Sequence, residues 1–339
     1  MPKALLSELQ FIAKSFEMVK PNIFRFRNRK YNSSEKRCNI VCDSELLRQS
    51  IIADLECLIY NIYHCRNDFS VNFQAFSNRF CYSDIQHFTE SLSNANTGLG
   101  TWDPGWKILD VEKNQFVVQK DKLKLWISEN EFISRSSACS VGDIGYIRAT
   151  KELRNLMPGF VMAIGDTPEE ETIEYPNLFR IYWNVCKDNA PALMRLVTSS
   201  LNKMGIPFRF KILKILEEYP RADAAVLYLN KKDFNHIKKT ILTIYNNIKP
   251  FLNPQTPLLA KRLGLGIALA EDPANGDSFG QNRSKVLAQA LYDAKKKKDI
   301  PSYDCLKKIS AYFSSLGLDL YRPYLNPGSV DSYDLQLDS

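Results

Sequence analysis

Three short segments between residues 179 and 229 alternate apolar and polar side chains, and this pattern constrains the fold more than any other feature. The segments are residues 179–185, 208–213 and 224–229. Because successive side chains of a strand point to opposite faces, each segment predicts a strand with one apolar and one polar face. Ile181 and Trp183 would lie on the apolar side. The opposite side carries arginine, lysine and tyrosine, so it is either a wet outer surface or an anion-binding floor.

The composition is that of a globular protein. The chain has 339 residues, of which 45% are hydrophobic and 24% charged, enough for one large or two ordinary domains. The net charge of +7 suits an anionic partner. The basic residues are scattered and no usual nucleic-acid recognition motif occurs, so nucleic acid is not the expected partner. No apolar run reaches membrane-spanning length and the first residues lack a signal-peptide core, which predicts a cytoplasmic protein without a membrane partner.

Cysteine and histidine give no sign of a metal site. None of the eight cysteines belongs to a CxxC pair, and the three histidines, His64, His87 and His236, do not stand at metal-ligand spacing. We therefore expect reduced thiols and no bound metal.

The pattern divides the chain into three regions. Residues 1–97 predict a mainly helical region that binds a peptide or a partner, because apolar residues recur there at helical spacing. Its basic segment between Lys20 and Arg37 is interpreted as a solvated connection, with ligand binding as the alternative. Residues 98–322 mix strands and helices and predict an α+β domain. Residues 323–339 carry aspartates and no basic residue, which predicts a flexible acidic tail.

Lys211 is the residue of the polar strand face best suited to chemistry. It shares that face with Arg209. A lysine that is partly desolvated and near other cations loses its proton more readily, so it can act as a base. The alternative is a sheet-edge lysine whose ammonium reaches water. Downstream, the acidic stretch at Glu271 and Asp272 precedes a capped helix with Arg283 in its first turn, which is either a decorated loop or an anion site.

Several motifs resemble, in the same order, those of the HopA-type family of bacterial type III effectors and their relatives. They are Gly100-Thr101-Trp102-Asp103-Pro104-Gly105-Trp106, Met157-Pro158-Gly159-Phe160, Phe179-Arg180-Ile181-Tyr182-Trp183-Asn184, Pro207-Phe208-Arg209-Phe210-Lys211, Arg221-Ala222-Asp223-Ala224-Ala225-Val226-Leu227-Tyr228-Leu229, Ala270-Glu271-Asp272-Pro273 and Ser278-Phe279-Gly280-Gln281-Asn282-Arg283. The resemblance covers roughly residues 98–291.

The resemblance implies a phospho-Ser/Thr lyase. Relatives encoded with class V lanthipeptide and thioamitide biosynthesis eliminate phosphate from a precursor peptide that a kinase-like phosphotransferase has phosphorylated, leaving dehydroalanine or dehydrobutyrine. The implied partners are that peptide, the kinase-like protein and a cyclase or decarboxylase of the same pathway, in the bacterial cytoplasm. The alternative is a non-catalytic type III effector or phosphopeptide-binding module, which as an effector would be secreted.

The resemblance also implies the fold of bacterial phosphothreonine lyases, a mixed or antiparallel sheet with flanking helices. Those enzymes use a strand-borne histidine as the acid and a strand-borne lysine as the base. In that order Lys211 would be the base, and Tyr182 would stand in the place of the acid. The implied phosphate-binding residues are Arg180, Arg209, Arg221, Lys261 and Arg283. The implied supporting residues are Asn184, Tyr228, Glu271 and Asp272. No cofactor is implied.

Overall fold

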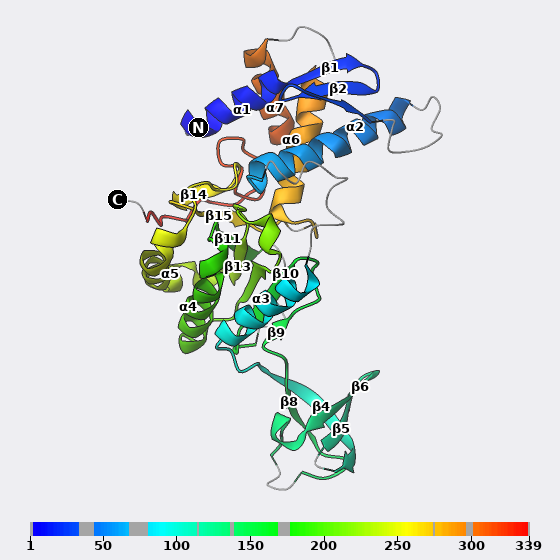
Figure 1. The fold of residues 1–339 in the computed structure, drawn as a ribbon, viewed down its shortest axis with the longest axis vertical. Helices are drawn as coiled ribbons and strands as arrows, with labels where there is room; N and C mark the ends of the chain where they lie inside the picture. The colour runs from blue at the N-terminus through cyan, green and yellow to red at the C-terminus, as the bar shows by residue number, and fades with distance from the viewer. Residues whose placement is uncertain are drawn as a thin grey trace.

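The protein combines three antiparallel sheets with helices. The computed structural model describes residues 3–33, 44–67, 81–113, 115–135, 139–168, 177–273, 275–295 and 301–337. These residues form a seven-stranded sheet (the large sheet), a five-stranded sheet (the projecting sheet) and a three-stranded sheet (the small sheet) (Figure 1). Short 3-10 turns lie at Glu129–Glu131, Lys187–Asn189, Leu216–Glu218, Lys231–Asp233 and Lys249–Phe251. The described strand pairs are antiparallel, and the predicted α+β class is confirmed.

The large sheet has the three predicted strands at its centre. In spatial order its strands are β14 (Lys261–Gly264), β15 (Ile267–Glu271), β11 (Leu178–Trp183), β13 (Ala225–Asn230), β12 (Arg209–Leu213), β10 (Phe160–Ile164) and β9 (Glu152–Leu153). The predicted alternation is confirmed, because Ile181, Trp183 and Phe210 belong to one buried core on one face. Arg180 and Lys211 project from the other face.

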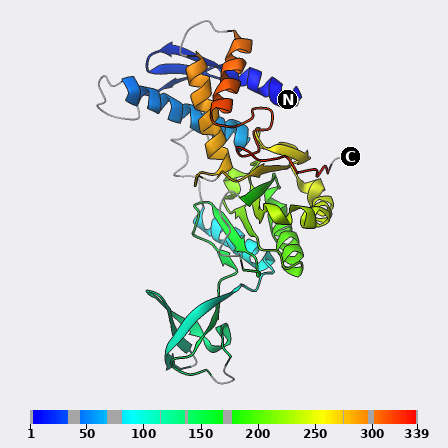
Figure 2. The same cartoon turned by 180° about the vertical axis from the view of Figure 1, so that it is seen from behind.

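Helices α3 (Tyr82–Ala95), α4 (Ala190–Lys203) and α5 (Phe234–Ile248) cover the apolar face of the large sheet (Figures 1 and 2). In α5, Ile237, Ile241 and Ile244 are buried at intervals of three or four residues, which is the spacing of a single helix face. Full burial of one such side chain stabilises the fold by about 1.5–3 kcal/mol. This core therefore anchors the central strands and fixes which of their side chains face away from it.

Helices from both ends of the chain pack together on the opposite side of the large sheet. They are α1 (Lys3–Ser15), α2 (Ser44–Ile59), α6 (Phe279–Lys295) and α7 (Ser302–Ser315). Leu9, Leu55, Leu287 and Phe313, one from each helix, belong to a single buried cluster. The packing does not follow the predicted boundary at residue 97, because N-terminal and C-terminal helices share this cluster (Figure 1).

The basic segment after α1 forms the small sheet instead of the predicted connection. Its strands are β1 (Phe16–Lys20), β2 (Ile23–Phe26) and β3 (Arg29–Asn32). Phe24 and Phe26 are buried, whereas Arg25 between them is exposed and pairs with Glu17 across the strands at 2.8 Å. The interleaved aromatic residues thus serve the core. Lys36 and Arg37 lie outside the described residues.

The projecting sheet stands away from the rest of the chain (Figures 1 and 2). In spatial order its strands are β6 (Leu123–Ser128), β5 (Gln115–Lys120), β4 (Trp102–Glu112), β8 (Ile144–Arg148) and β7 (Phe132–Ile133). Its own small core includes Trp106, Ile108 and Val118. Residues 96–101 and 149–151 connect it to α3 and β9, and we call these two segments the stem.

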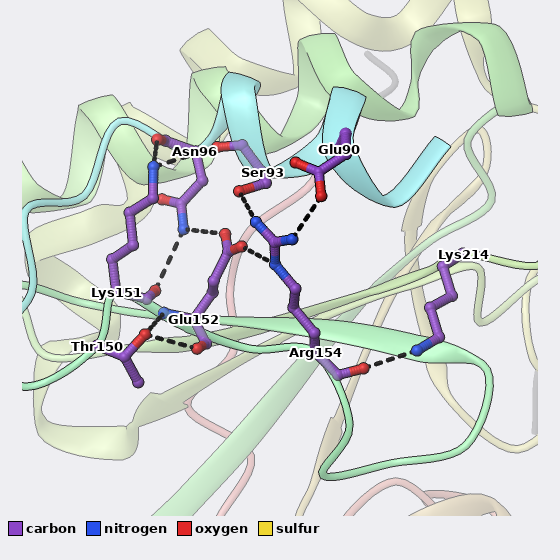
Figure 3. Close-up of polar contacts among 8 residues, drawn as sticks. All are labelled: Glu90, Ser93, Asn96, Thr150, Lys151, Glu152, Arg154 and Lys214. Atoms are coloured by element: carbon purple, nitrogen blue, oxygen red, sulfur yellow. Dashed lines mark hydrogen bonds and ion pairs between the residues drawn. The ribbon is translucent and has the colours of Figure 1, made fainter. Parts of the chain in front are cut away.

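A polar network holds the stem against α3 and β9 (Figure 3). The Asn96 side-chain amide donates to the Lys151 carbonyl and to Glu152 Oε2, both at 3.2 Å. Lys151 Nζ donates to the Asn96 carbonyl at 2.8 Å, and Arg154 Nε donates to Glu152 Oε1 at 2.7 Å. Burial opposes ionisation of Glu152, but hydrogen bonds from Ser93, Arg154 and Asn96 lower its pKa below the usual value. Both carboxylate oxygens are thus engaged, and the stem is fixed.

The C-terminal segment packs on the large sheet, so the predicted flexible tail is wrong for residues 323–337. Tyr333, Leu335 and Leu337 belong to the main buried core. The Leu337 N–H donates to the Leu263 carbonyl at 2.8 Å, beside the edge strand β14. The apolar residues between the aspartates anchor the segment, which the acidic composition alone does not indicate. Residues 338 and 339 lie outside the described part of the chain.

Candidate functional site

The polar face of the large sheet brings five predicted site residues together. Arg180 of β11 lies opposite Tyr228 of β13, which lies opposite Arg209 of β12. In the next row, Tyr182 and Lys211 both lie opposite Val226 of β13, one on each side of it. Opposite residues of antiparallel strands have Cβ atoms about 4.5–5.5 Å apart. We call this area the polar floor; its residues are Arg180, Tyr182, Arg209, Lys211 and Tyr228.

Lys211 is a buried cation with no ion-pair partner among the described residues. It is only 7% exposed. Its ammonium lies 4.6 Å from the centroid of the Phe160 ring on β10. A desolvated ammonium over an aromatic face gains about 2 kcal/mol from the ring quadrupole. Aromatic packing therefore holds Lys211, while its donors are not committed to a carboxylate in the described structure.

Arg221 lies beside the same aromatic ring as Lys211, with its Cζ 5.7 Å from the centroid of Phe160. Arg221 Nε and Nη2 donate to the two oxygens of Asp223 at 2.8 and 2.9 Å, and Nη1 donates to Glu218 at 2.6 Å. Burial favours the neutral carboxyl, but the charge and hydrogen bonds of Arg221 hold the pKa of Asp223 well below its usual range. Asp223 stays ionised, so a phosphate here would share Arg221 with carboxylates.

Arg180 is held by Asp272, one of the supporting residues that the resemblance implies. Arg180 Nε and Nη2 donate to Asp272 Oδ2 at 2.8 and 2.7 Å. The guanidinium carbon lies 5.0 Å from the centroid of the Tyr228 ring. Both residues thus orient Arg180 on the polar floor.

His64 is a site residue that the sequence patterns do not reveal. It ends the π-helical turn Tyr60–His64, which continues α2, and its ring lies 5.4 Å from the Tyr182 ring. Its Nε2 is 4.0 Å from Asp223 Oδ2. A Cβ at position 280 would lie 2.5 Å from the imidazole, so only Gly280 permits this close approach of α6. The packing of the N-terminal helices therefore places a histidine beside the polar floor.

Burial lowers the pKa of His64 from 6.5 to about 4. The cations Arg221, Lys211 and Arg180 lower it as well, and Asp223 opposes them. The imidazole is therefore neutral at pH 7 in the free protein. A dianion bound nearby would favour the imidazolium and raise the pKa. The signal available in the sequence is weak, because the four-residue spacing from Tyr60, whose ring stacks on His64 at 5.1 Å, is typical of any buried helix face.

Comparison with known families places this sheet in a defined group of proteins. A family model described as the HopA1 effector protein family matches residues 152–325, just over half of the 339 residues. The chain belongs to the HopA1 effector protein family. The resemblance seen in the sequence is thereby confirmed. A search of curated proteins finds no match.

Two solved structures are similar to this HopA1-family chain. The effector protein from Pseudomonas syringae pv. tomato strain DC3000 is 17% identical, with a TM-score of 0.48 over 95% of this chain and 98% of that one. The effector protein from Pseudomonas syringae pv. syringae strain 61 is also 17% identical, with a TM-score of 0.48 over 96% of this chain and 98% of that one.

The segment matched by the HopA1 family contains the whole polar floor but not His64. It begins at Glu152 and ends at Leu325. The small sheet, the projecting sheet and His64 all precede it. The family segment therefore supplies the cations, and a region outside it supplies the histidine.

Two predicted phosphate-binding residues of the HopA1 segment have other partners. Lys261 pairs across the sheet with Leu269, which pairs with Ile181, so the side chain of Lys261 leaves the sheet on the side opposite the polar floor. Its Nζ donates to both oxygens of Asp331 at 2.9 Å. Arg283 Nε and Nη2 donate to backbone carbonyls of the C-terminal segment at 2.8 and 2.9 Å. Strand register and the packed tail, neither visible in composition, explain both differences.

Glu271 and Asn184 hold neighbouring segments. Glu271 accepts hydrogen bonds from the Tyr333 hydroxyl at 3.1 Å and pairs with Lys231 at 2.9 Å. The Asn184 amide donates to the Gln255 carbonyl at 2.9 Å. Their contacts support the fold around the polar floor and do not orient its arginines.

In the stretches that the structure describes, no helix combines the length and apolar character needed to cross a bilayer. The same stretches hold no group of three or more His, Cys, Asp or Glu residues suited to a metal ion. The cysteines in them are free thiols.

Proposed function

We propose that this HopA1-family protein is a phospho-Ser/Thr lyase that acts on a phosphorylated precursor peptide. The reaction breaks the Cα–H and Cβ–O bonds of the phosphoresidue, forms the Cα=Cβ bond of dehydroalanine or dehydrobutyrine and releases inorganic phosphate. Atoms and electrons balance without an oxidant or reductant. The chemistry needs a base at Cα, positive charge around the phosphate and a donor for the leaving oxygen.

The buried Lys211, which lacks a carboxylate partner in the described structure, is the observation that carries the proposal. In the proposed reaction Lys211 removes the Cα proton, and the arginines bind phosphate through forked, charge-assisted hydrogen bonds. The cations around the site are Arg180, Arg209, Lys211 and Arg221, and the carboxylates are Glu218, Asp223 and Asp272. With His64 neutral and Lys211 protonated, four cations face three carboxylates, and this excess of positive charge favours a bound dianion. Lys211 then loses its proton before it acts as the base.

Tyr182 and His64 serve the leaving oxygen in this proposal. The Tyr182 hydroxyl is buried and has no hydrogen-bond partner among the described residues. Burial raises its pKa well above the usual 10, so it donates a hydrogen bond but keeps its proton. His64 gains a proton when the phosphate dianion binds and passes it to the leaving oxygen. A general acid of this kind contributes about 10²–10⁴-fold in rate.

The direct test is mass spectrometry of phosphoserine and phosphothreonine peptides incubated with the protein. We expect loss of phosphoric acid and formation of the dehydroamino acid. Lys211→Arg keeps the positive charge but not an effective base, so it should bind the phosphopeptide and leave its mass unchanged. Lys203→Arg, an exposed lysine on α4, is the matched control and should react as the parent does.

A second candidate function is a non-catalytic effector or phosphopeptide-binding module. The ion pairs of Arg180 with Asp272 and of Arg221 with Asp223 favour it, because they already use part of the cationic charge. Phosphopeptide binding without any mass change, equal in the parent and in Lys211→Arg, would establish this module and reject the lyase.

The proposed lyase implies partners and a location. A kinase-like phosphotransferase must supply the phosphopeptide, and a cyclase or decarboxylase would consume the dehydrated product. These steps take place in the bacterial cytoplasm, whereas the effector alternative requires secretion. Co-purification of the protein with a phosphorylated precursor peptide and its kinase from the producing cell tests this assignment.

A further inference from the structure

The projecting sheet exposes a face that its own core does not use. Trp126 of β6 is 60% exposed and Ile144 of β8 is 68% exposed. Tyr146, two residues after Ile144, projects from the same face. β5 and β4 separate these two strands, so Trp126 stands at one edge of the face and the Ile144–Tyr146 pair lies beyond both of them. Exposed apolar side chains of this size gathered on one sheet face are candidates for an interaction surface. We call this surface the outer face; its residues are Lys107, Gln119, Lys124, Trp126, Ile144 and Tyr146.

The register of the strands places lysines in a row on the outer face. Ile144 lies opposite Lys107, Lys107 opposite Gln119, and Gln119 opposite Lys124. Within the described stretches neither Lys107 nor Lys124 has an ion-pair partner, whereas Lys120 is paired with Asp103 at 3.0 Å. β6 itself contains Lys124 and no acidic residue. Asp110 lies on the same side of the sheet, opposite Val117 and two strands away from Trp126, so in the described structure it does not pair with Lys124. The positive charge of Lys124 beside Trp126 on β6 therefore favours a partner that is both acidic and apolar.

β6 is the edge strand of the projecting sheet. It pairs with β5 along its length, and in the described structure no strand pairs with its other side. An edge strand offers free backbone donors and acceptors to an extended peptide, and side chains on alternate residues then decide which peptide fits. Lysine on an edge strand commonly deters pairing, but an exposed tryptophan two residues away has the opposite effect.

We propose that β6 and the outer face bind an extended, unphosphorylated segment of a peptide, which adds a strand to the projecting sheet. Its acidic side chain lies against Lys124 and its large apolar side chain, two residues later, lies against Trp126, so the segment runs parallel to β6. Because side chains on one face of a strand recur every second residue, the two recognised residues are separated by a single residue. Identification of the bound peptide as the lyase substrate rests on the proposed function. Binding of such a peptide to β6 does not.

The position of the outer face suits recruitment of a peptide. The projecting sheet precedes the segment matched by the HopA1 family, which begins at residue 152. The stem holds it through the Asn96, Lys151 and Glu152 network, so a segment bound to β6 keeps a fixed relation to the large sheet (Figure 3). Binding there would raise the local concentration of the rest of the peptide near the polar floor.

The test uses labelled, unphosphorylated peptides in fluorescence polarisation with the full chain. One peptide carries Glu-x-Leu in a threonine-rich host, and its partner carries Glu-x-x-Leu, which puts the two side chains on opposite faces. We expect the first to bind about fivefold more tightly, and to shift the emission of Trp126 to the blue as it is buried. Equal affinity of the two peptides would overturn the proposal.

Two variants sharpen the test. Lys124→Glu should weaken Glu-x-Leu binding about fivefold and strengthen binding of a Lys-x-Leu peptide by a similar factor. Trp126→Ser should abolish the emission shift and weaken binding of both. These side chains lie outside the sheet's core, so far-UV circular dichroism should be unchanged. The assignment would be overturned if Lys124→Glu did not switch the preference from Glu-x-Leu to Lys-x-Leu. Tight binding of a single-stranded oligonucleotide in place of the peptides would also overturn it.

The outcome is independent of the lyase reaction. Unphosphorylated peptides report on the outer face alone, and a short phosphopeptide without the Glu-x-Leu element reports on the polar floor alone. If the short phosphopeptide is not dehydrated but Glu-x-Leu still binds in register, the docking surface stands and the lyase fails. If the short phosphopeptide is dehydrated but Glu-x-Leu and Glu-x-x-Leu bind equally well, the docking surface is rejected and the lyase is supported.

Discussion

The imidazole of His64 meets the ring of Tyr182 edge-on, with the ring centroids 5.4 Å apart and the planes at 88°. Tyr182 lies on a central strand of the segment shared with the HopA1 family, whereas His64 ends a π-helical turn that precedes this segment. The two groups proposed to serve the leaving oxygen therefore come from different parts of the chain. The packing of the N-terminal helices on α6 is what brings them together.

The pH dependence of stability should report the burial of His64. Its folded pKa of about 4 is below the ordinary value of 6.5, so protonation favours the unfolded chain. The contribution is complete above pH 6.5 and is lost as the pH falls towards 4; for a shift of this size it amounts to about 3 kcal/mol. His64→Gln should remove this dependence, measured by urea unfolding near neutral pH and at about pH 5. His236→Gln, at an exposed position of α5, is the control and should retain the slope.

Asp223 affects stability in a different pH range from His64, so it does not contribute to the change expected between neutral pH and pH 5. Its pKa is held below the ordinary 3.8 by Arg221, so its stabilisation is present above that value and is lost only at lower pH. A parent protein whose stability does not change between neutral pH and pH 5 would show that His64 is not buried as described.

Removing only one partner of the Arg221–Asp223 ion pair should strongly lower the free energy of unfolding. Asp223→Asn leaves a buried guanidinium with Glu218 as its remaining carboxylate partner in the described structure, so we expect a loss of about 3–5 kcal/mol in the free energy of unfolding. The double variant Arg221→Met with Asp223→Asn removes both charges and should recover part of that loss. The exposed pair Arg322 and Asp319 is the reference, and its removal should cost no more than about 1 kcal/mol. Additive effects in the double variant would contradict a coupled pair.

The polar floor could be predicted from the sequence because alternation along a strand is a local property. The faces of Ile181 and Lys211 follow from the period of two, and antiparallel neighbours then place Arg180, Arg209 and Tyr228 together. The site that surrounds the floor could not be predicted in the same way. His64 reaches it through packing between distant helices, and Lys261 leaves the sheet on the opposite side because of the strand register.

The C-terminal segment shows why composition alone misleads. Its aspartates suggest a solvated tail, but Tyr333 is buried and its hydroxyl donates to Glu271 at 3.1 Å. Asp331 accepts from Lys261, so an acidic residue is itself part of the anchor. A few apolar residues in a polar segment are sufficient when an exposed sheet edge lies nearby, and that edge is not visible in the sequence.

Tyr333→Ala should therefore destabilise the whole fold. The ring packs at 4.9 Å from Phe234 and 5.6 Å from Phe179 within the main core, so a loss of about 3–5 kcal/mol is expected in thermal or urea unfolding. Val330→Ala, at an 82% exposed position of the same segment, should change stability by less than about 0.5 kcal/mol. Equal, small effects of the two substitutions would mean that the segment does not pack in solution.

Loosening the stem should expose it to proteases while the two sheets remain folded. Asn96→Ala removes the hydrogen bonds to the Lys151 carbonyl and to the Glu152 carboxylate. The loss of these bonds should favour local opening by about 2 kcal/mol, and trypsin should cleave after Arg148 or Lys151 about 30-fold faster. Gln119→Ala, which removes a hydrogen bond to the Asp121 carbonyl in the projecting sheet, is the control and should leave stem cleavage unchanged. Because global unfolding would give cuts throughout the chain, two stable fragments identify local opening, and an unchanged cleavage rate would show that the network does not hold the stem.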